Sequence, residues 1–152
     1  MGVRMPDDEA WEMLRRSHTG ILTTLRRDGM PITLPIWFVT LDRTICFAAP
    51  SRTKKVARLR HDPRASFLVE DGERWAELRA VHCTGRVERV EDPELIERID
   101  RALDEKYAAF RTPRSDMPEA TQRHYAGRTF FRLVPDARIL SWDNRRLGIG
   151  GD

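Results

Sequence analysis

Apolar and polar residues alternate most clearly at residues 81–88, where Val81, Cys83, Gly85 and Val87 occupy every second position. This period of two is typical of an antiparallel strand with one buried face. Apolar runs rich in β-branched residues predict further strands at 19–25, 31–41, 44–49, 65–70, 129–135 and 137–142. Asp28-Gly29 is typical of a hairpin turn between the first two of these.

Helical spacing of apolar residues occurs at three places. The clearest is residues 92–110, where Asp92 is suited to cap a helix whose apolar face comprises Leu95, Ile96, Ile99, Leu103 and Tyr107. Residues 6–17, with acidic residues in the first turn, predict a short N-terminal helix. Residues 53–60 predict another, which ends at Asp62-Pro63 because the residue before proline avoids the helical region.

Short strands joined mostly by tight turns predict a mainly β fold, a closed or nearly closed antiparallel barrel with flanking helices. The 152 residues are enough for one domain with its own core, so we expect a single domain spanning 1–152. Cys46 and Cys83 each lie inside a predicted strand, and we expect both to be buried free thiols.

The formal net charge is only +3, and basic residues are spread along the chain among nearly as many acidic ones. Because nucleic-acid-binding proteins more often gather positive charge in one stripe, we expect no nucleic-acid partner. No apolar run has the length of a membrane span and no signal-peptide core is present, so we expect a cytoplasmic protein without membrane association. The four histidines share no metal-ligand spacing, and we expect no metal site.

Lysine is rare in this chain. Among 27 lysines and arginines, lysine occurs only at Lys54, Lys55 and Lys106. The first two stand at the start of the predicted helix 53–60, where free backbone N–H groups and the helix dipole favour an anion. Hydroxyls and further charge come from the neighbours Ser51, Arg52 and Thr53. Together these residues form a candidate phosphate site. The alternative is that the lysines are solvated surface residues and Thr53 is only a cap.

Four segments occur in an order that resembles one known family: "GILTTLRRDGMPITLPIWF", "SRTKKVARLRHDPRASFLVEDG", "TGRVERVEDPE" and "SWDNRRLG". They are similar to the pyridoxamine 5'-phosphate oxidase-like flavin-binding split barrels, and within them to the actinobacterial branch that uses the deazaflavin coenzyme F420. The resemblance covers Ser17 to Gly148. It implies a six-stranded antiparallel split β-barrel, paired as a homodimer with the cofactor between the chains.

The resemblance also implies a cofactor site. Lys54 and Lys55 would hold the cofactor phosphate, with Ser51, Arg52 and Thr53 nearby. The segment Pro35, Ile36, Trp37 and Phe38 would lie along the ring system, with backbone groups of Ile36 and Trp37 bonded to its polar edge; the alternative is that Trp37 is an ordinary core residue. Arg79 matches a flavin-binding arginine of the oxidases. Trp142, with Arg145 or Arg146, resembles a C-terminal pair that reaches the partner's cofactor.

One departure from the oxidases bears on the cofactor. Their arginine is followed by a glutamine that helps to hold the flavin, whereas Arg79 is followed here by Ala80. The missing polar contact weakens the case for FMN and for pyridoxamine phosphate oxidation, while the deazaflavin interpretation does not need it.

The resemblance therefore implies a reductase that passes a hydride from reduced F420 to a small-molecule acceptor. The alternatives are an FMN-dependent oxidoreductase with the same groove, and a non-catalytic protein that carries F420 or haem. No catalytic acid or base can be named from the sequence. We expect the side chains of both Lys54 and Lys55 to be exposed.

Overall fold

The computed structural model describes residues 2–148, with residues 124 and 125 as backbone only. Its elements are, in chain order, α1 (Asp7–Arg16), β1 (Gly20–Leu25), β2 (Pro31–Ile36), β3 (Val39–Leu41), β4 (Thr44–Pro50), α2 (Lys54–His61), β5 (Arg64–Asp71), η1 (Trp75–Glu77), β6 (Arg79–Arg89), α3 (Pro93–Tyr107), η2 (Ala108–Phe110), η3 (Arg114–Asp116), α4 (Glu119–Ala126), β7 (Arg128–Pro135), β8 (Leu140–Asp143) and η4 (Asn144–Leu147).

The strands form one sheet in the order β2-β1-β5-β6-β7-β4-β3, and every pairing in it is antiparallel. The long strand β6 pairs with β8 over its first residues and with β7 over its last ones. The two strands that end this order, β2 and β3, are separated in sequence only by Trp37 and Phe38. Because so short a connection cannot span a flat sheet, the sheet curls until its two ends meet.

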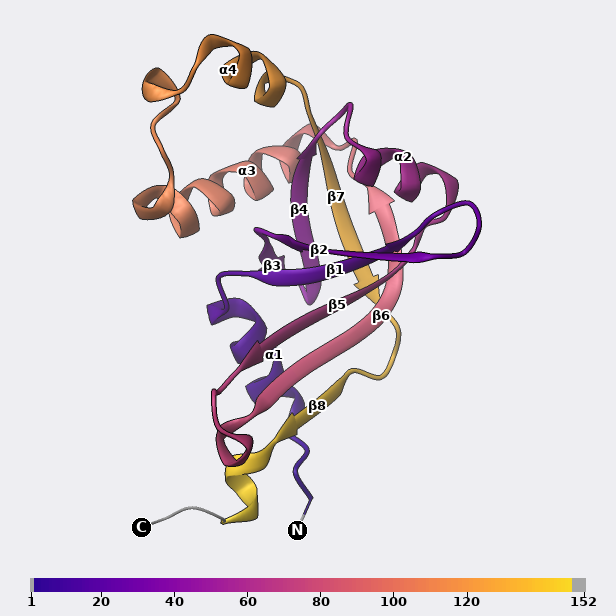
Figure 1. Ribbon diagram of the computed structural model, residues 1–152, viewed down its shortest axis with the longest axis vertical. Helices are drawn as coiled ribbons and strands as arrows, with labels where there is room; N and C mark the ends of the chain where they lie inside the picture. The colour runs from indigo at the N-terminus through magenta and orange to yellow at the C-terminus, as the bar shows by residue number, and fades with distance from the viewer. Residues whose placement is uncertain (1, 149–152) are drawn as a thin grey trace.

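The curled sheet with flanking helices confirms the predicted mainly β, barrel-like fold class (Figure 1). The described part of the chain has eight strands, whereas the resemblance implies six. One reason is that the predicted strand 31–41 is divided into β2 and β3, because the backbone leaves the sheet at Trp37 and Phe38.

Strand β4 supplies side chains to both hydrophobic cores. Ile45 and Phe47 lie in the core enclosed by the curled sheet, whereas Cys46, between them in sequence, belongs to a second core under α3. This is the alternation expected of a strand buried on both faces. Cys46 and Cys83 are free and buried, which confirms that prediction, and burial raises the pKa of the Cys83 thiol to about 12.

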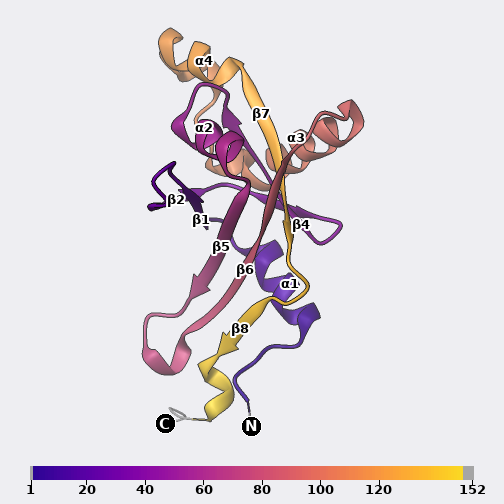
Figure 2. The same ribbon diagram turned by 90° about the vertical axis from the view of Figure 1, so that its right-hand side faces the viewer.

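Three of the four α-helices in the described chain gather towards one end of the molecule, and α1 lies nearer its middle (Figures 1 and 2). Helices α2, α3 and α4 surround one end of β4 and β7, whereas β8 and η4 lie at the other end (Figures 1 and 2). There the amide of Asp143 donates to the carbonyl of Val3 at 2.7 Å, which joins the N-terminal segment to β8. None of the helices in residues 2–148 is long and apolar enough to cross a membrane.

Candidate functional site

The basic turn, defined as residues 51–55, connects β4 to α2. Arg52, Lys54 and Lys55 take part in none of the ion pairs within the described chain. Lys54 is exposed as expected, but Lys55 is half-buried. Burial, and then the nearby positive charge of Arg58, lowers the pKa of Lys55. A positive charge held there without a carboxylate is suited to receive an external anion.

The hydroxyls of the basic turn bond within the protein. Thr53 Oγ1 donates to the carbonyl of Pro50 at 2.9 Å, and the hydroxyls of Ser51 and Thr129 are 2.8 Å apart. Thr53 precedes α2 but makes no side-chain cap. Within residues 2–148 the amides of Lys54, Lys55 and Val56 therefore have no hydrogen-bond acceptor. Such free amides at a helix start are a common feature of anion sites.

The predicted ring-binding segment leaves the sheet after its second residue. Pro35 is exposed on β2, and Ile36 is buried opposite Gly20 of β1. The Phe38 backbone is held instead by α3: its amide donates to Tyr107 Oη at 3.0 Å, and its carbonyl accepts from Lys106 Nζ at 3.0 Å. These bonds replace the strand partner that Phe38 would otherwise need.

Trp37 is not an ordinary core residue, since 39% of its surface is exposed. Its ring stacks on that of Tyr107, with centroids 4.4 Å apart and planes 5° from parallel. Its backbone amide and carbonyl make no hydrogen bond to any residue in the described chain. Unpaired backbone groups beside a cavity are available to a ligand, so the contact of Trp37 with a ring's polar edge stays a prediction.

A cavity of about 950 Å³ lies beside these two features, although none of the residues of the basic turn lines it. Trp37 contributes to one part of its wall, and Pro50, which precedes the basic turn, to another. The remaining wall comes from Ala48 of β4, α3, the segment 110–118, α4 and Arg128 of β7. A volume of this size is at the upper end of ordinary small-molecule sites.

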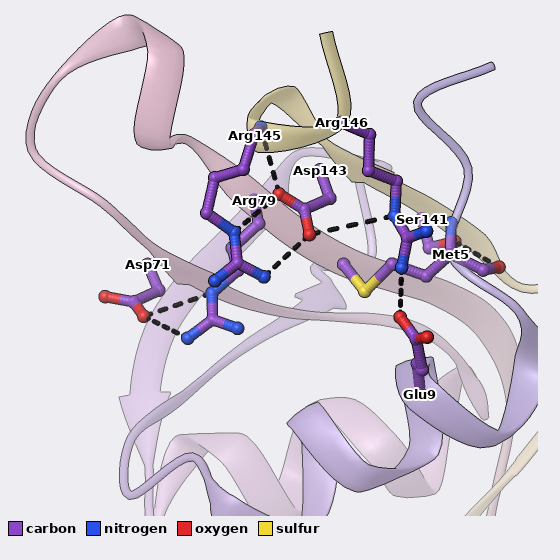
Figure 3. A network of polar contacts seen from close by, with 8 residues as sticks. All are labelled: Met5, Glu9, Asp71, Arg79, Ser141, Asp143, Arg145 and Arg146. Carbon is purple, nitrogen blue, oxygen red and sulfur yellow. Dashed lines mark hydrogen bonds and ion pairs between the residues drawn. The ribbon is translucent and has the colours of Figure 1, made fainter. Parts of the chain in front are cut away.

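Arg79 and Arg146 lie in a separate group at the β8 end of the molecule (Figure 3), and Trp142 belongs to β8 itself. Arg79 binds Asp71 at 2.7 Å, and this hydrogen-bonded guanidinium holds the pKa of the Asp71 carboxyl below its usual value. Trp142 is half-buried on β8, paired with Ala80 of β6.

Asp143 organises the C-terminal arginines of this group. It is 2% exposed and receives two guanidinium bonds from Arg145, at 2.8 and 2.7 Å. The guanidinium of Arg146 is directed inward, with its Nε 3.8 Å from Asp143 and its terminal nitrogen bonded to Glu9 (Figure 3). The side chain of Arg145 is therefore more exposed than that of Arg146, at 53% against 34%.

The predicted cofactor residues thus form two groups. In the first group, Trp37 lines the large cavity, and the basic turn follows directly after the lining residue Pro50. Arg79, Trp142 and Arg146 instead lie with β8 and η4, away from α2 (Figure 1). Sequence reasoning missed Lys106 and Tyr107, which fix the segment 36–38. A signal was present, since Lys106 is the third lysine of the chain and Tyr107 ends the apolar face of α3.

A family model for pyridoxamine 5'-phosphate oxidase matches residues 6–140 of the chain. The chain belongs to the pyridoxamine 5'-phosphate oxidase family. Three of the four segments quoted for the resemblance fall within the matched region, whereas "SWDNRRLG", residues 141–148, follows it. No curated protein matches the chain.

Solved structures of this family's fold resemble the chain along most of its length. The conserved hypothetical protein Rv2991 from Mycobacterium tuberculosis is 33% identical, with a TM-score of 0.83 and coverage of 99% of this chain and 92% of that one. An F420 reductase is 23% identical, with a TM-score of 0.66 and coverage of 90% and 98%. An FAD-binding protein from Mesorhizobium loti is 19% identical, with a TM-score of 0.70 and coverage of 90% and 93%. The last two similarities establish the fold alone.

Proposed function

We propose that this protein is an F420-dependent reductase of the pyridoxamine 5'-phosphate oxidase family. The observation that carries the proposal is the cavity between Trp37, whose backbone groups are unpaired, and Pro50, which directly precedes the basic turn. A cofactor with an anionic tail and a flat ring with a polar edge needs both features. Reduced F420, when bound, would supply the hydride, and the protein would supply binding and orientation.

The chain's own residues divide the work of holding such a cofactor. Arg52, Lys54 and Lys55, with the free amides at the start of α2, would bind the phosphate. Backbone groups of Trp37 would receive the polar edge of the ring, since those of Phe38 already bond to Tyr107 and Lys106. The proton that the acceptor takes up besides the hydride would come from solvent.

Position 80 favours the deazaflavin over FMN. Ala80 is buried on β6, in register with Glu70 and Trp142, so it offers no side-chain polar group to a flavin. The existence of an F420 reductase with the same fold is compatible with this choice. FMN in the same groove, or a carrier of F420 or haem, are the alternatives that the experiment below must separate.

The test is calorimetric titration of the protein with F420, FMN and haem, followed by the variant Lys54→Ala/Lys55→Ala. We expect F420 to bind, and the double variant to lose about 2–4 kcal/mol of binding free energy, because two charge-assisted contacts are removed. The control is Arg60→Ala, which removes an exposed positive charge from the same helix but outside the basic turn.

Three results would count against the proposal. Unchanged F420 affinity in the double variant would mean that Lys54 and Lys55 are ordinary surface residues. Tight binding of FMN or haem with no uptake of F420 would select an alternative cofactor. Tight F420 binding without turnover of a panel of quinones, enones and tetrapyrroles would favour the carrier.

A further inference from the structure

The large cavity extends beyond the part that the proposed cofactor path uses. Trp37 and Pro50 border the cavity next to the proposed cofactor contacts, whereas most of the wall comes from α3 and the chain that follows it. This chain, from η2 to α4, extends away from the sheet (Figure 1). Phe110, Pro113 and Met117 line the cavity from this side, and Leu103 of α3 and Ala48 of β4 complete an apolar lining. The cavity therefore has room for a second molecule beside the cofactor ring.

Two large aromatic side chains are exposed at this cavity. Trp37 is 39% exposed and Phe110 is 58% exposed, although both could bury more surface against a ligand. Trp37 is held rigidly, since it stacks on Tyr107 and has the Arg111 guanidinium 5.9 Å from its ring centre. His18 lies edge-on to Phe110, with centroids 4.6 Å apart. Exposed aromatic rings that already have a supporting partner are suited to bind another planar ring.

The charges of the cavity wall largely neutralise one another. Arg128 bonds to Asp100 at 2.8 Å, and Arg111 bonds to Asp104 at 2.5 Å. The two remaining charged lining residues, Arg114 and Asp116, have opposite signs and lie on the same turn, η3. An anionic ligand would find no surplus positive charge here, in contrast to the basic turn, and would lose its hydration. This part of the cavity therefore favours an uncharged ligand.

We propose that the cavity between Trp37 and the segment 110–118 is the acceptor site, and that the acceptor is a planar, uncharged ring compound. The inference rests on the proposed function, which places the cofactor ring along Pro35–Phe38. Trp37 lies at the boundary between the two molecules, and Phe110 is the residue that contacts the acceptor alone.

The probe is menadione, a neutral naphthoquinone, and its anionic comparison is menadione sulfonate. Both are titrated calorimetrically into cofactor-free protein, so that binding is measured without turnover. We expect menadione to bind, and Phe110→Ala to raise its Kd about tenfold through loss of an aromatic contact. Met30→Ala, which truncates a side chain of similar exposure (53%) at the β1–β2 turn, is the matched control and should bind menadione as wild type does.

Each outcome separates this inference from the proposed function. Equal Kd values for Phe110→Ala and Met30→Ala, or sulfonate binding as tight as that of menadione, would overturn the acceptor site. If Lys54→Ala/Lys55→Ala loses F420 binding but still binds menadione, the result supports both the cofactor site and the acceptor site. Menadione binding in a wild-type protein that takes up no F420 would remove the proposed function and leave a binding site for planar neutral rings.

Discussion

At the scale of single residues, Lys106 is a half-buried cation that forms no ion pair within the described chain. Its Nζ donates to the Phe38 carbonyl at 3.0 Å and lies 4.0 Å from the centre of the Phe38 ring. Burial, with a smaller effect of Arg15, lowers the pKa of Lys106 from 10.5 to about 8. The protein thus holds this cation by a carbonyl and a ring face instead of a carboxylate.

The lowered pKa of Lys106 makes stability depend on pH. Between pH 8 and 10.5 the unfolded state binds more protons at this residue than the folded state does, so its contribution to the free energy of unfolding rises with pH. Lys106→Met should show a smaller increase between pH 7 and pH 9.5 than wild type, measured by urea denaturation. Buried thiols oppose this increase but are present in both proteins.

Lys54→Met is the control for this measurement, because Lys54 is exposed. It should reproduce the wild-type dependence on pH. If Lys106→Met also has the wild-type dependence, then the ammonium of Lys106 is solvated in the folded protein, and its bond to Phe38 contributes little.

At the scale of elements, β7 passes close to the backbone of β6 at Gly85. A Cβ added there would lie 2.2 Å from the carbonyl oxygen of Val134 and 3.0 Å from Cα of Pro135, and both of these atoms are backbone. Because backbone cannot move aside as a side chain can, Gly85→Ala should reduce the free energy of unfolding by about 1–3 kcal/mol. Chemical denaturation checks this, with Gly127→Ala as control, since an added Cβ there meets nothing within 4 Å. Equal stability of the two variants would mean that β7 can shift at little cost.

Elements with a strong local pattern could be predicted from the sequence. The alternation at residues 81–88 lies inside β6. The apolar periodicity that begins at Asp92 predicts α3, and the Asp92 side chain accepts a hydrogen bond from the Glu94 amide, as expected of an N-cap. Strand β4 and helix α2 were also predicted to within a residue or so. In each case short-range propensity and burial favour the same structure.

Long-range contacts could not be predicted in the same way. The break at Trp37 and Phe38 depends on Tyr107 and Lys106, which lie almost seventy positions away in sequence. The basic turn was found because two lysines stand out in a local stretch, but the cavity wall at 110–118 has no periodicity to reveal it. The rarity of lysine marks Lys106 as unusual, but nothing in the local sequence says that its partner is Phe38.

At the scale of the whole molecule, one chain does not bring the predicted cofactor residues together. The basic turn lies with α2 and α4, whereas Trp142 and Arg146 lie with β8 and η4 at the other end (Figures 1 and 2). If one cofactor contacts both groups, then a second copy of the chain must supply one of them. A two-fold homodimer would do so twice, with two equivalent sites.

Mixing two defective variants tests this arrangement. Lys54→Ala/Lys55→Ala removes the basic turn, and Trp142→Ala/Arg146→Ala removes the C-terminal group; we expect each protein alone to bind F420 poorly. When the two are co-refolded at equal amounts, half of the dimers should be mixed, and one of the two sites in each mixed dimer would combine the intact groups. About a quarter of the wild-type binding capacity should therefore return, measured as calorimetric stoichiometry. A mixture that binds no better than its components, or wild type that stays monomeric by light scattering at the concentrations at which it binds F420, would show that a single chain completes its own site.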